Sequence, residues 1–130
     1  MLKIGDSLEI YDRVNEDMLA VTVGSGELQV LATPCVVALM ENAASNLAKK
    51  GLSEELTTVG TMISIEHVSP TPLGAEIRAE AILEETDGRT FKFSVKAYDK
   101  KGLIAKGSHI RVSVKSEKFQ KKAEEKFDEI

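Results

Sequence analysis

Three side chains have types that could carry out acid–base or nucleophilic chemistry: the hydroxyl of Thr33, the carboxylate of Glu41 and the imidazole of His67. A hydroxyl needs a neighbouring base to become a good nucleophile, and a carboxylate can orient an imidazole for that role; the Thr33 hydroxyl could instead position an attacking water. On a helix, Thr33 and Glu41 would lie about 80° apart around the axis and about two turns apart along it, so both can face the same side. Chemistry at these residues requires a fold that brings His67 to the helix.

Each of these residues also has a purely structural interpretation. Thr33 precedes Pro34 and could simply be the N-cap of a helix, with proline at the first helical position. Glu41 could be a solvated residue at the helix edge, and His67 a core histidine that donates to a backbone carbonyl. Cys35 is a rival nucleophile or a small apolar filler, because no cation is fixed beside it in sequence. The residue types alone leave these alternatives open.

The helix that would position Thr33 and Glu41 begins at Thr33 and ends near Lys50, before Gly51. It has one apolar face, formed by Val36, Leu39, Met40, Ala43, Ala44 and Leu47. Such a helix needs a sheet to cover it. The backbone N–H groups of Cys35 and Val36 in its first turn are candidate donors to an oxyanion of a bound substrate.

The rest of the chain supplies the strands of such a sheet. We assign no element to residues 1–18 and predict strands over 19–23, 57–68, 75–85, 90–98 and 103–115, with a flexible Gly-Ser-Gly link at 24–26 that could form a lid and a hairpin turn at Asp87-Gly88. His67 shares one strand face with Val59, Thr61, Ile63 and Ile65. The last strand is expected to have a bulge near Gly107, after which Ile110, Val112 and Val114 point inward.

A C-terminal helix is predicted over 116–130, with a narrow apolar stripe of Phe119, Ala123, Phe127 and Ile130. The expected fold class is therefore α+β, a single domain over residues 1–130 in which an antiparallel sheet wraps one long helix. A long edge strand would remain, which favours pairing with a second copy of the chain.

Composition excludes several classes of function. The net charge of -4 and the pI near 5.3 argue against binding to nucleic acid. The sequence has no apolar run long enough for a membrane span, and its first residues lack the apolar core of a signal peptide, so we expect a cytoplasmic protein. One cysteine and two histidines are too few for a disulfide or a dedicated zinc site, so we expect no metal.

Three segments, LATPCVVALMENA, VGTMISIEHVSPTPLG and GLIAKGSHIRVSV, resemble in order and spacing the fluoroacetyl-CoA thioesterase family of the hot-dog fold. The resemblance implies that Thr33, Glu41 and His67 form a catalytic set, and that Gly60 lies beside the acyl end of an acyl-CoA substrate. Gly60 could otherwise mark a strand bulge. The resemblance also implies a homodimer with its sites at the subunit interface, and no cofactor other than the coenzyme A of the substrate.

The sequence departs from the family at the lid, because residues 24–29 contain none of the aromatic residues found there in the fluoroacetyl-CoA enzyme. The same chemistry on a different small acyl group is therefore one expectation. A non-catalytic acyl-CoA-binding protein and a hot-dog hydratase or dehydratase are the alternatives. His109 is interpreted as structural, at a dimer contact, and the lysines or arginines that would bind the CoA phosphates are not assigned.

Overall fold

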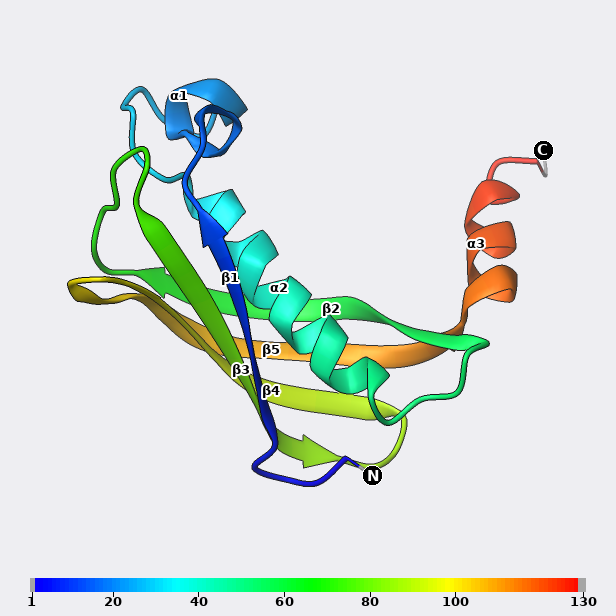
Figure 1. The fold of residues 1–130 in the computed structure, drawn as a ribbon. Coiled ribbons are helices and arrows are strands. Elements are labelled where there is room, and N and C mark those ends of the chain that lie inside the picture. The colour runs from blue at the N-terminus through cyan, green and yellow to red at the C-terminus, as the bar shows by residue number, and fades with distance from the viewer. Residues whose placement is uncertain (1, 129–130) are drawn as a thin grey trace.

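A computed structural model of the chain describes residues 2–128. Its elements, in chain order, are β1 (Ser7–Arg13), the short 3₁₀ helix η1 (Glu16–Met18), α1 (Ala20–Val23), α2 (Thr33–Lys49), β2 (Leu56–His67), β3 (Glu76–Thr86), β4 (Thr90–Asp99), β5 (Gly102–Lys115) and α3 (Ser116–Glu124). The strands in this range form one antiparallel sheet in the order β1-β3-β4-β5-β2, and α2 lies across one face of it (Figure 1). An antiparallel sheet against one long helix is the architecture that the pattern predicts, although the strands do not follow one another as a simple meander, because β2 pairs with β5 rather than with β3.

The core lies between α2 and the sheet. All six residues of the predicted apolar face of α2 are buried, together with the inward-facing residues of β3 and β4: Ile77, Ala79, Ala81, Leu83, Phe91, Phe93, Val95 and Ala97. The hairpin between these strands is confirmed as well, with Gly88 at φ 91° and the Asp87 carboxylate accepting from two backbone N–H groups of the turn. Alternation of period two on β3 and β4 therefore predicts their buried faces correctly.

The predicted strand at 19–23 is wrong, because this segment is the short helix α1. Leu19 bridges to Leu31, and the Ala20 N–H donates to the Val30 carbonyl, so the chain turns back on itself here. Gly24, at φ 81°, ends the helix in the left-handed conformation that glycine adopts without strain. η1, α1 and the following loop, residues 16–30, are called the lid segment below.

The register of β5 also differs from the prediction. Its irregularity lies at Ile104, opposite Ala97 and Tyr98, and a second register shift lies between Gly60 and Met62 on β2. Gly107 pairs regularly. Because the faces do not reverse at Gly107, the alternation that buries Ala105 continues, and the last strand buries His109 and Arg111 instead of Ile110, Val112 and Val114.

The two edges of the sheet are β1 and β2. β1, which the sequence pattern leaves unassigned, pairs with β3 along its whole length. β2 pairs with β5 on one side, and within residues 2–128 no strand pairs along its other side. β2 is the strand that carries Gly60 and His67, so the outer edge lies next to the candidate site.

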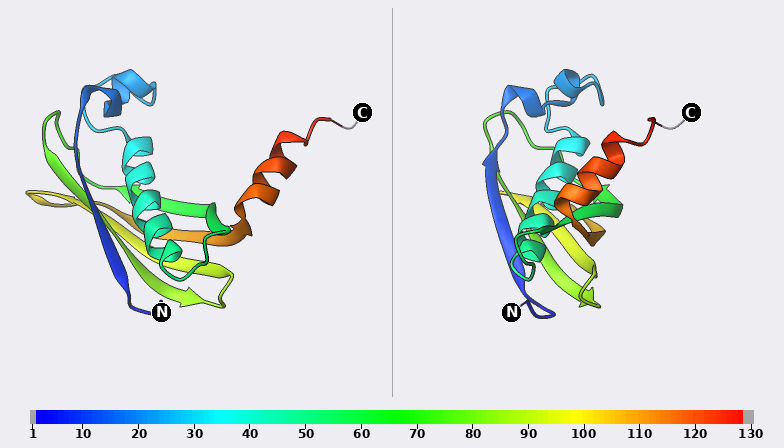
Figure 2. Two further views of the ribbon diagram at one scale, coloured as in Figure 1. Left: turned by 45° about the vertical axis from the view of Figure 1, so that its right-hand side comes forward. Right: turned by 90° about the vertical axis from the view of Figure 1, so that its right-hand side faces the viewer.

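The C-terminal helix α3 is shorter than predicted, Ser116–Glu124, and Ile130 of its expected apolar stripe lies outside the described residues. α3 rises from the end of β5 on the face of the sheet that carries α2, and it leans toward the side where β2 forms the edge (Figure 2). The Ser116 N–H donates to the Glu55 carbonyl, which ties the base of α3 to the start of β2.

No helix within residues 2–128 combines the length and the apolar character needed to cross a membrane. In the same range, histidine, cysteine, aspartate and glutamate side chains form no group of three or more that could hold a metal ion.

Candidate active site

Thr33 and His67 meet at the N-terminal end of α2. A hydrogen bond of 2.7 Å joins Thr33 Oγ1 to His67 Nδ1, and it links the first residue of α2 to the last residue of β2. Around the pair lies a small hollow of about 300 Å³, lined also by the lid segment and by the residues that follow β2. The geometry is that of a hydroxyl held against an imidazole base.

Thr33 is therefore not the simple helix cap that its position next to Pro34 allows. The N-cap residue is Ala32, and the Thr33 hydroxyl bonds to His67 across the site rather than to the helix backbone. His67 is likewise not satisfied by a backbone carbonyl. Its Nε2 is buried and has no hydrogen-bond partner among residues 2–128, which is uncommon for a buried polar atom outside functional sites.

The N–H groups of Cys35 and Val36 are not free oxyanion donors, contrary to the expectation. Both donate to the Ala32 carbonyl, at 3.0 Å and 3.2 Å, because Ala32 is the N-cap residue and its carbonyl accepts the first hydrogen bonds of the helix. Burial raises the pKa of the half-buried Cys35 thiol, which disfavours the thiolate. The structure thus supports the interpretation of Cys35 as a filler rather than a nucleophile.

Glu41 lies farther along α2 and makes no hydrogen bond to His67 within the described chain; it faces a different group of residues. A Cβ built on Gly60 would lie 3.2 Å from Glu41 Oε2, 3.1 Å from His109 Cε1 and 3.4 Å from Arg111 Nη1. Because Gly60 has no side chain, the Glu41 carboxylate can approach His109 and Arg111 at this point. A second hollow, of about 440 Å³, opens here between α2 and β2.

The expected electrostatic partner of Glu41 was His67, but its carboxylate acts on the buried guanidinium of Arg111, whose pKa it raises. Arg111 donates from Nε to the Thr58 hydroxyl at 2.7 Å and from Nη2 to the Thr58 carbonyl at 2.9 Å. Burial lowers the pKa of the guanidinium and the Glu41 carboxylate raises it. Sequence reasoning missed Arg111 because a bulge near Gly107, where none occurs, would place this residue on the outer face of β5.

His109 is held in one tautomer by its neighbours. Its Nδ1 lies 2.8 Å from the Met62 carbonyl, which can only accept, so Nδ1 carries the proton. Nε2 then accepts from Arg111 Nη1 at 3.2 Å. Burial lowers the pKa of His109, as does the Arg111 charge, while the Met62 carbonyl and the Glu41 carboxylate raise it. His109 positions Arg111 in this group.

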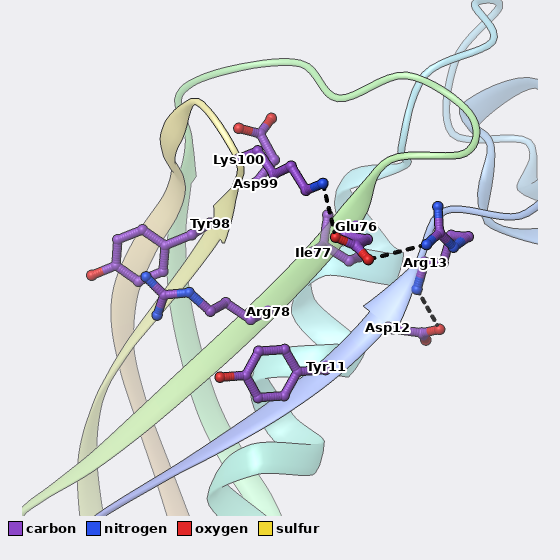
Figure 3. A pocket seen from close by; sticks show the side chains of 9 residues that line it. All are labelled: Tyr11, Asp12, Arg13, Glu76, Ile77, Arg78, Tyr98, Asp99 and Lys100. Atoms are coloured by element: carbon purple, nitrogen blue, oxygen red, sulfur yellow. Dashed lines mark hydrogen bonds and ion pairs between the residues drawn. The ribbon is translucent and has the colours of Figure 1, made fainter.

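A third hollow, of about 720 Å³, lies on the outer part of the sheet and contains none of these residues (Figure 3). Its charged side chains satisfy one another: Glu76 pairs with Arg13 at 3.1 Å and with Lys100 at 3.2 Å. The Arg78 guanidinium lies 4.1 Å from the centre of the Tyr98 ring. Because these charges are paired and no base and nucleophile meet there, this hollow is not the candidate site.

Comparison with known proteins shows which family the chain belongs to. The sequence profile of the fluoroacetyl-CoA-specific thioesterase family matches residues 14–117, which include every residue of the two groups described above. The chain belongs to this family. It is therefore a thioester hydrolase by descent.

Relatives of this family show how far the likeness extends. The fluoroacetyl-CoA thioesterase of Streptantibioticus cattleyicolor is 33% identical over 98 residues, 75% of this chain and 70% of that protein. A crystal structure of the fluoroacetyl-CoA thioesterase FlK superposes with a TM-score of 0.90 at 26% identity, covering 97% of this chain and 98% of the other. A hot-dog-like protein from Thermanaerovibrio acidaminovorans has a TM-score of 0.85 at 21% identity, over 97% and 93% of the two chains. The fold is thus the hot-dog fold.

Proposed function

We propose that this thioester hydrolase acts on the coenzyme A thioester of a small acyl group, with Thr33, His67 and Glu41 as its catalytic set. The observation that carries the proposal is the 2.7 Å hydrogen bond between the Thr33 hydroxyl and the His67 imidazole at the start of α2. The adjoining hollow of about 300 Å³ is at the lower end of the usual size of ligand pockets, which suits a small acyl group. The aliphatic lid segment argues against a preference as narrow as that for fluoroacetyl-CoA.

A homodimer formed along the outer edge of β2 is part of the proposal. Within one chain, Glu41 faces Gly60, which lies seven residues from His67 on β2, or roughly 23 Å at about 3.3 Å per residue. The centre of β2 lies between Thr61 and Met62. If a second copy pairs antiparallel about this centre, its Gly60 lies opposite Ile63, only four residues, or roughly 13 Å, from His67.

Antiparallel pairing would therefore make one composite site from two different hollows. The hollow beside Thr33 and His67 of one chain would adjoin the hollow beside Glu41 and Arg111 of the other, and the twofold axis would generate two such sites. The Glu41 carboxylate and the Arg111 guanidinium of the second copy would then face a thioester bound at Thr33. This arrangement explains why Glu41 and His67 do not meet within one chain.

The proposed reaction has two steps. His67 Nδ1 takes the Thr33 proton while the hydroxyl oxygen attacks the thioester carbonyl carbon; the carbon–sulfur bond then breaks, and the CoA thiolate leaves and takes up the proton from His67. Water, deprotonated by His67, next attacks the acyl-threonine ester and releases the carboxylic acid and the free hydroxyl.

The single cysteine, which can form no internal disulfide, supports a cytoplasmic location for this reaction.

The assignment is tested by measuring thiol release from acetyl-, propionyl- and fluoroacetyl-CoA. We expect Thr33→Ala and His67→Ala each to lower kcat/KM by at least ~100-fold, while Thr33→Ser, which keeps a hydroxyl, retains much more activity. An acyl group bound to Thr33 should be detectable by mass spectrometry in the first turnover. Turnover unchanged in both alanine variants would contradict the assignment of the catalytic set. Thermal stabilisation of the unmodified chain by acyl-CoA without release of thiol would instead indicate a binding protein.

A further inference from the structure

α3 is a helix whose packing surface is missing within the described chain. None of the residues of Ser116–Glu124 is buried, although Phe119 and Ala123 form an apolar stripe one turn apart. A nine-residue helix is marginal in water by itself, because too few hydrogen bonds offset the cost of nucleation. The stripe therefore calls for a partner surface.

The exposed apolar side chains of the molecule are unevenly distributed. Eleven large ones are exposed within residues 2–128, and seven of these lie in the lid segment, on or just after β2, or at the C-terminal end: Val21, Val23, Leu28, Met62, Val68, Phe119 and Phe127. In a single chain α3 and the lid segment lie at opposite ends of the sheet (Figure 1). They cannot cover each other within one chain.

Antiparallel pairing of β2 with a second copy, which belongs to the proposed function and on which this inference rests, would bring α3 and the lid segment together. α3 begins beside Leu56, since Lys115 pairs with Leu56. Pairing about the centre of β2 places Leu56 opposite His67 of the copy, and the lid segment shares a hollow with His67. α3 also leans toward the β2 edge, where that copy would lie (Figure 2).

The charges of the two surfaces are complementary. The lid segment carries Glu16, Asp17 and Glu27 and has no lysine or arginine. α3 carries three lysines and two glutamates, and therefore has a net positive charge: Lys118, Lys121, Lys122, Glu117 and Glu124. Lysines that flank Phe119 would face carboxylates that flank Val21, Val23 and Leu28, which favours this docking over a helix-to-helix contact between two α3 segments.

We infer that α3 of each chain docks on the lid segment of a second copy, with Phe119 against Val21, Val23 and Leu28. α3 then forms the outer wall of the neighbour's hollow at Thr33 and His67 and holds the lid segment over it. Each site of the dimer is thus completed by the C-terminal helix of the other chain, in addition to the contribution of Glu41.

Cysteine cross-linking tests this contact directly. In a Cys35→Ala background, the double variant Phe119→Cys/Leu28→Cys should form a disulfide between chains on mild oxidation, because the two Cβ atoms would lie within the separation that a disulfide can span. The matched control is Glu117→Cys/Leu28→Cys, which moves the thiol to the opposite face of α3. We expect a covalent dimer only with the Phe119→Cys/Leu28→Cys variant, and none with either single-cysteine chain alone.

Hydrogen exchange gives a second readout that does not depend on the new cysteines. In full-length Phe119→Ser, amides of residues 19–24 should exchange at least ~10-fold faster than in the unmodified chain, while amides of β3 and β4 stay unchanged. A chain that is dimeric and hydrolyses acyl-CoA, but gives no cross-link and no change in lid exchange, would overturn the α3 contact and leave the proposed function intact. A monomeric chain at micromolar concentration would overturn both the dimer and this contact.

Discussion

At the scale of residues, the site consists of two groups with different chemistry. Thr33 and His67 provide a hydroxyl against a base, whereas the buried His109 and Arg111 are hydrogen-bonded to each other beside Gly60, with the partly buried Glu41 carboxylate nearby. The hydrogen bonds of His109 and Arg111 have specific donors and acceptors, which fixes the geometry of this pair. His109, expected at a dimer contact, is instead buried within one chain, where it bonds to the Met62 carbonyl and to Arg111.

His109 should make the stability of the fold depend on pH. Its folded-state pKa is lowered below the ordinary value of 6.5, chiefly by burial, so the unfolded chain binds the proton more readily. Stability is then fully present above pH 6.5 and is lost as the pH falls below it, by at most about 1.4 kcal/mol per pH unit. Chemical denaturation at pH 7.5 and 5.5 should show a smaller difference for His109→Asn, which can still donate to the Met62 carbonyl. An equal difference in both proteins would contradict this role.

At the scale of elements, the β2–β5 pair positions most of the site, since Gly60 and His67 lie on β2 and His109 and Arg111 on β5. The pair is closely packed at Gly107. A Cβ at this position would lie only 1.9 Å from the Ser64 carbonyl oxygen and 2.8 Å from the Ile65 side chain. Glycine is therefore required for the two strands to approach, even though Gly107 is not the bulge.

Gly107→Ala should separate β2 from β5 at this point. We expect the free energy of unfolding to fall by on the order of 3 kcal/mol, because a backbone carbonyl cannot move aside as a flexible side chain can. Gly26→Ala is the matched control, since the nearest contact of its Cβ is 3.4 Å and it lies in the lid segment. Urea denaturation compares the two variants, and equal midpoints would show that the strands tolerate the methyl group.

At the scale of the whole molecule, the proposed dimer depends on the outer edge of β2. Met62 is 40% exposed and lies next to the centre of the strand, so in an antiparallel pair it would lie close to Met62 of the second copy. A side chain so close to the twofold axis meets an identical one. Any charge introduced here is therefore placed beside the same charge.

Met62→Glu and Met62→Lys should each weaken the dimer by juxtaposing like charges, and an equimolar mixture of the two should restore it. Sedimentation velocity at micromolar concentration measures the association, and activity should follow it because the site is proposed to be shared. Lys92→Glu, at an exposed position on β4, is the control for a simple change of net charge. If neither Met62 variant changes the association state, the interface lies elsewhere.

The sequence by itself determined the elements whose signals are local. The apolar face of α2 and the alternation of β3 and β4 follow from periodicities of 3.6 and 2, which neighbouring residues alone specify. Gly88 marked its hairpin in the same way, because the turn needs a left-handed residue there. The meeting of Thr33 with His67 was expected only from the resemblance to the thioesterase family, because the residue types alone left a helix cap and a core histidine as alternatives.

The tertiary structure alone decided the partners that depend on long-range register. The bulge of β5 lies at Ile104 and not near Gly107, so Ala105, His109 and Arg111 alternate onto one buried face, and no local pattern fixes where such a bulge falls. Glu41 consequently faces Arg111 instead of His67. β1 likewise has a weak local pattern and becomes a strand because β3 offers it an edge. Pairings between distant segments depend on the packing of the whole sheet, which the spacing of residues along the chain does not contain.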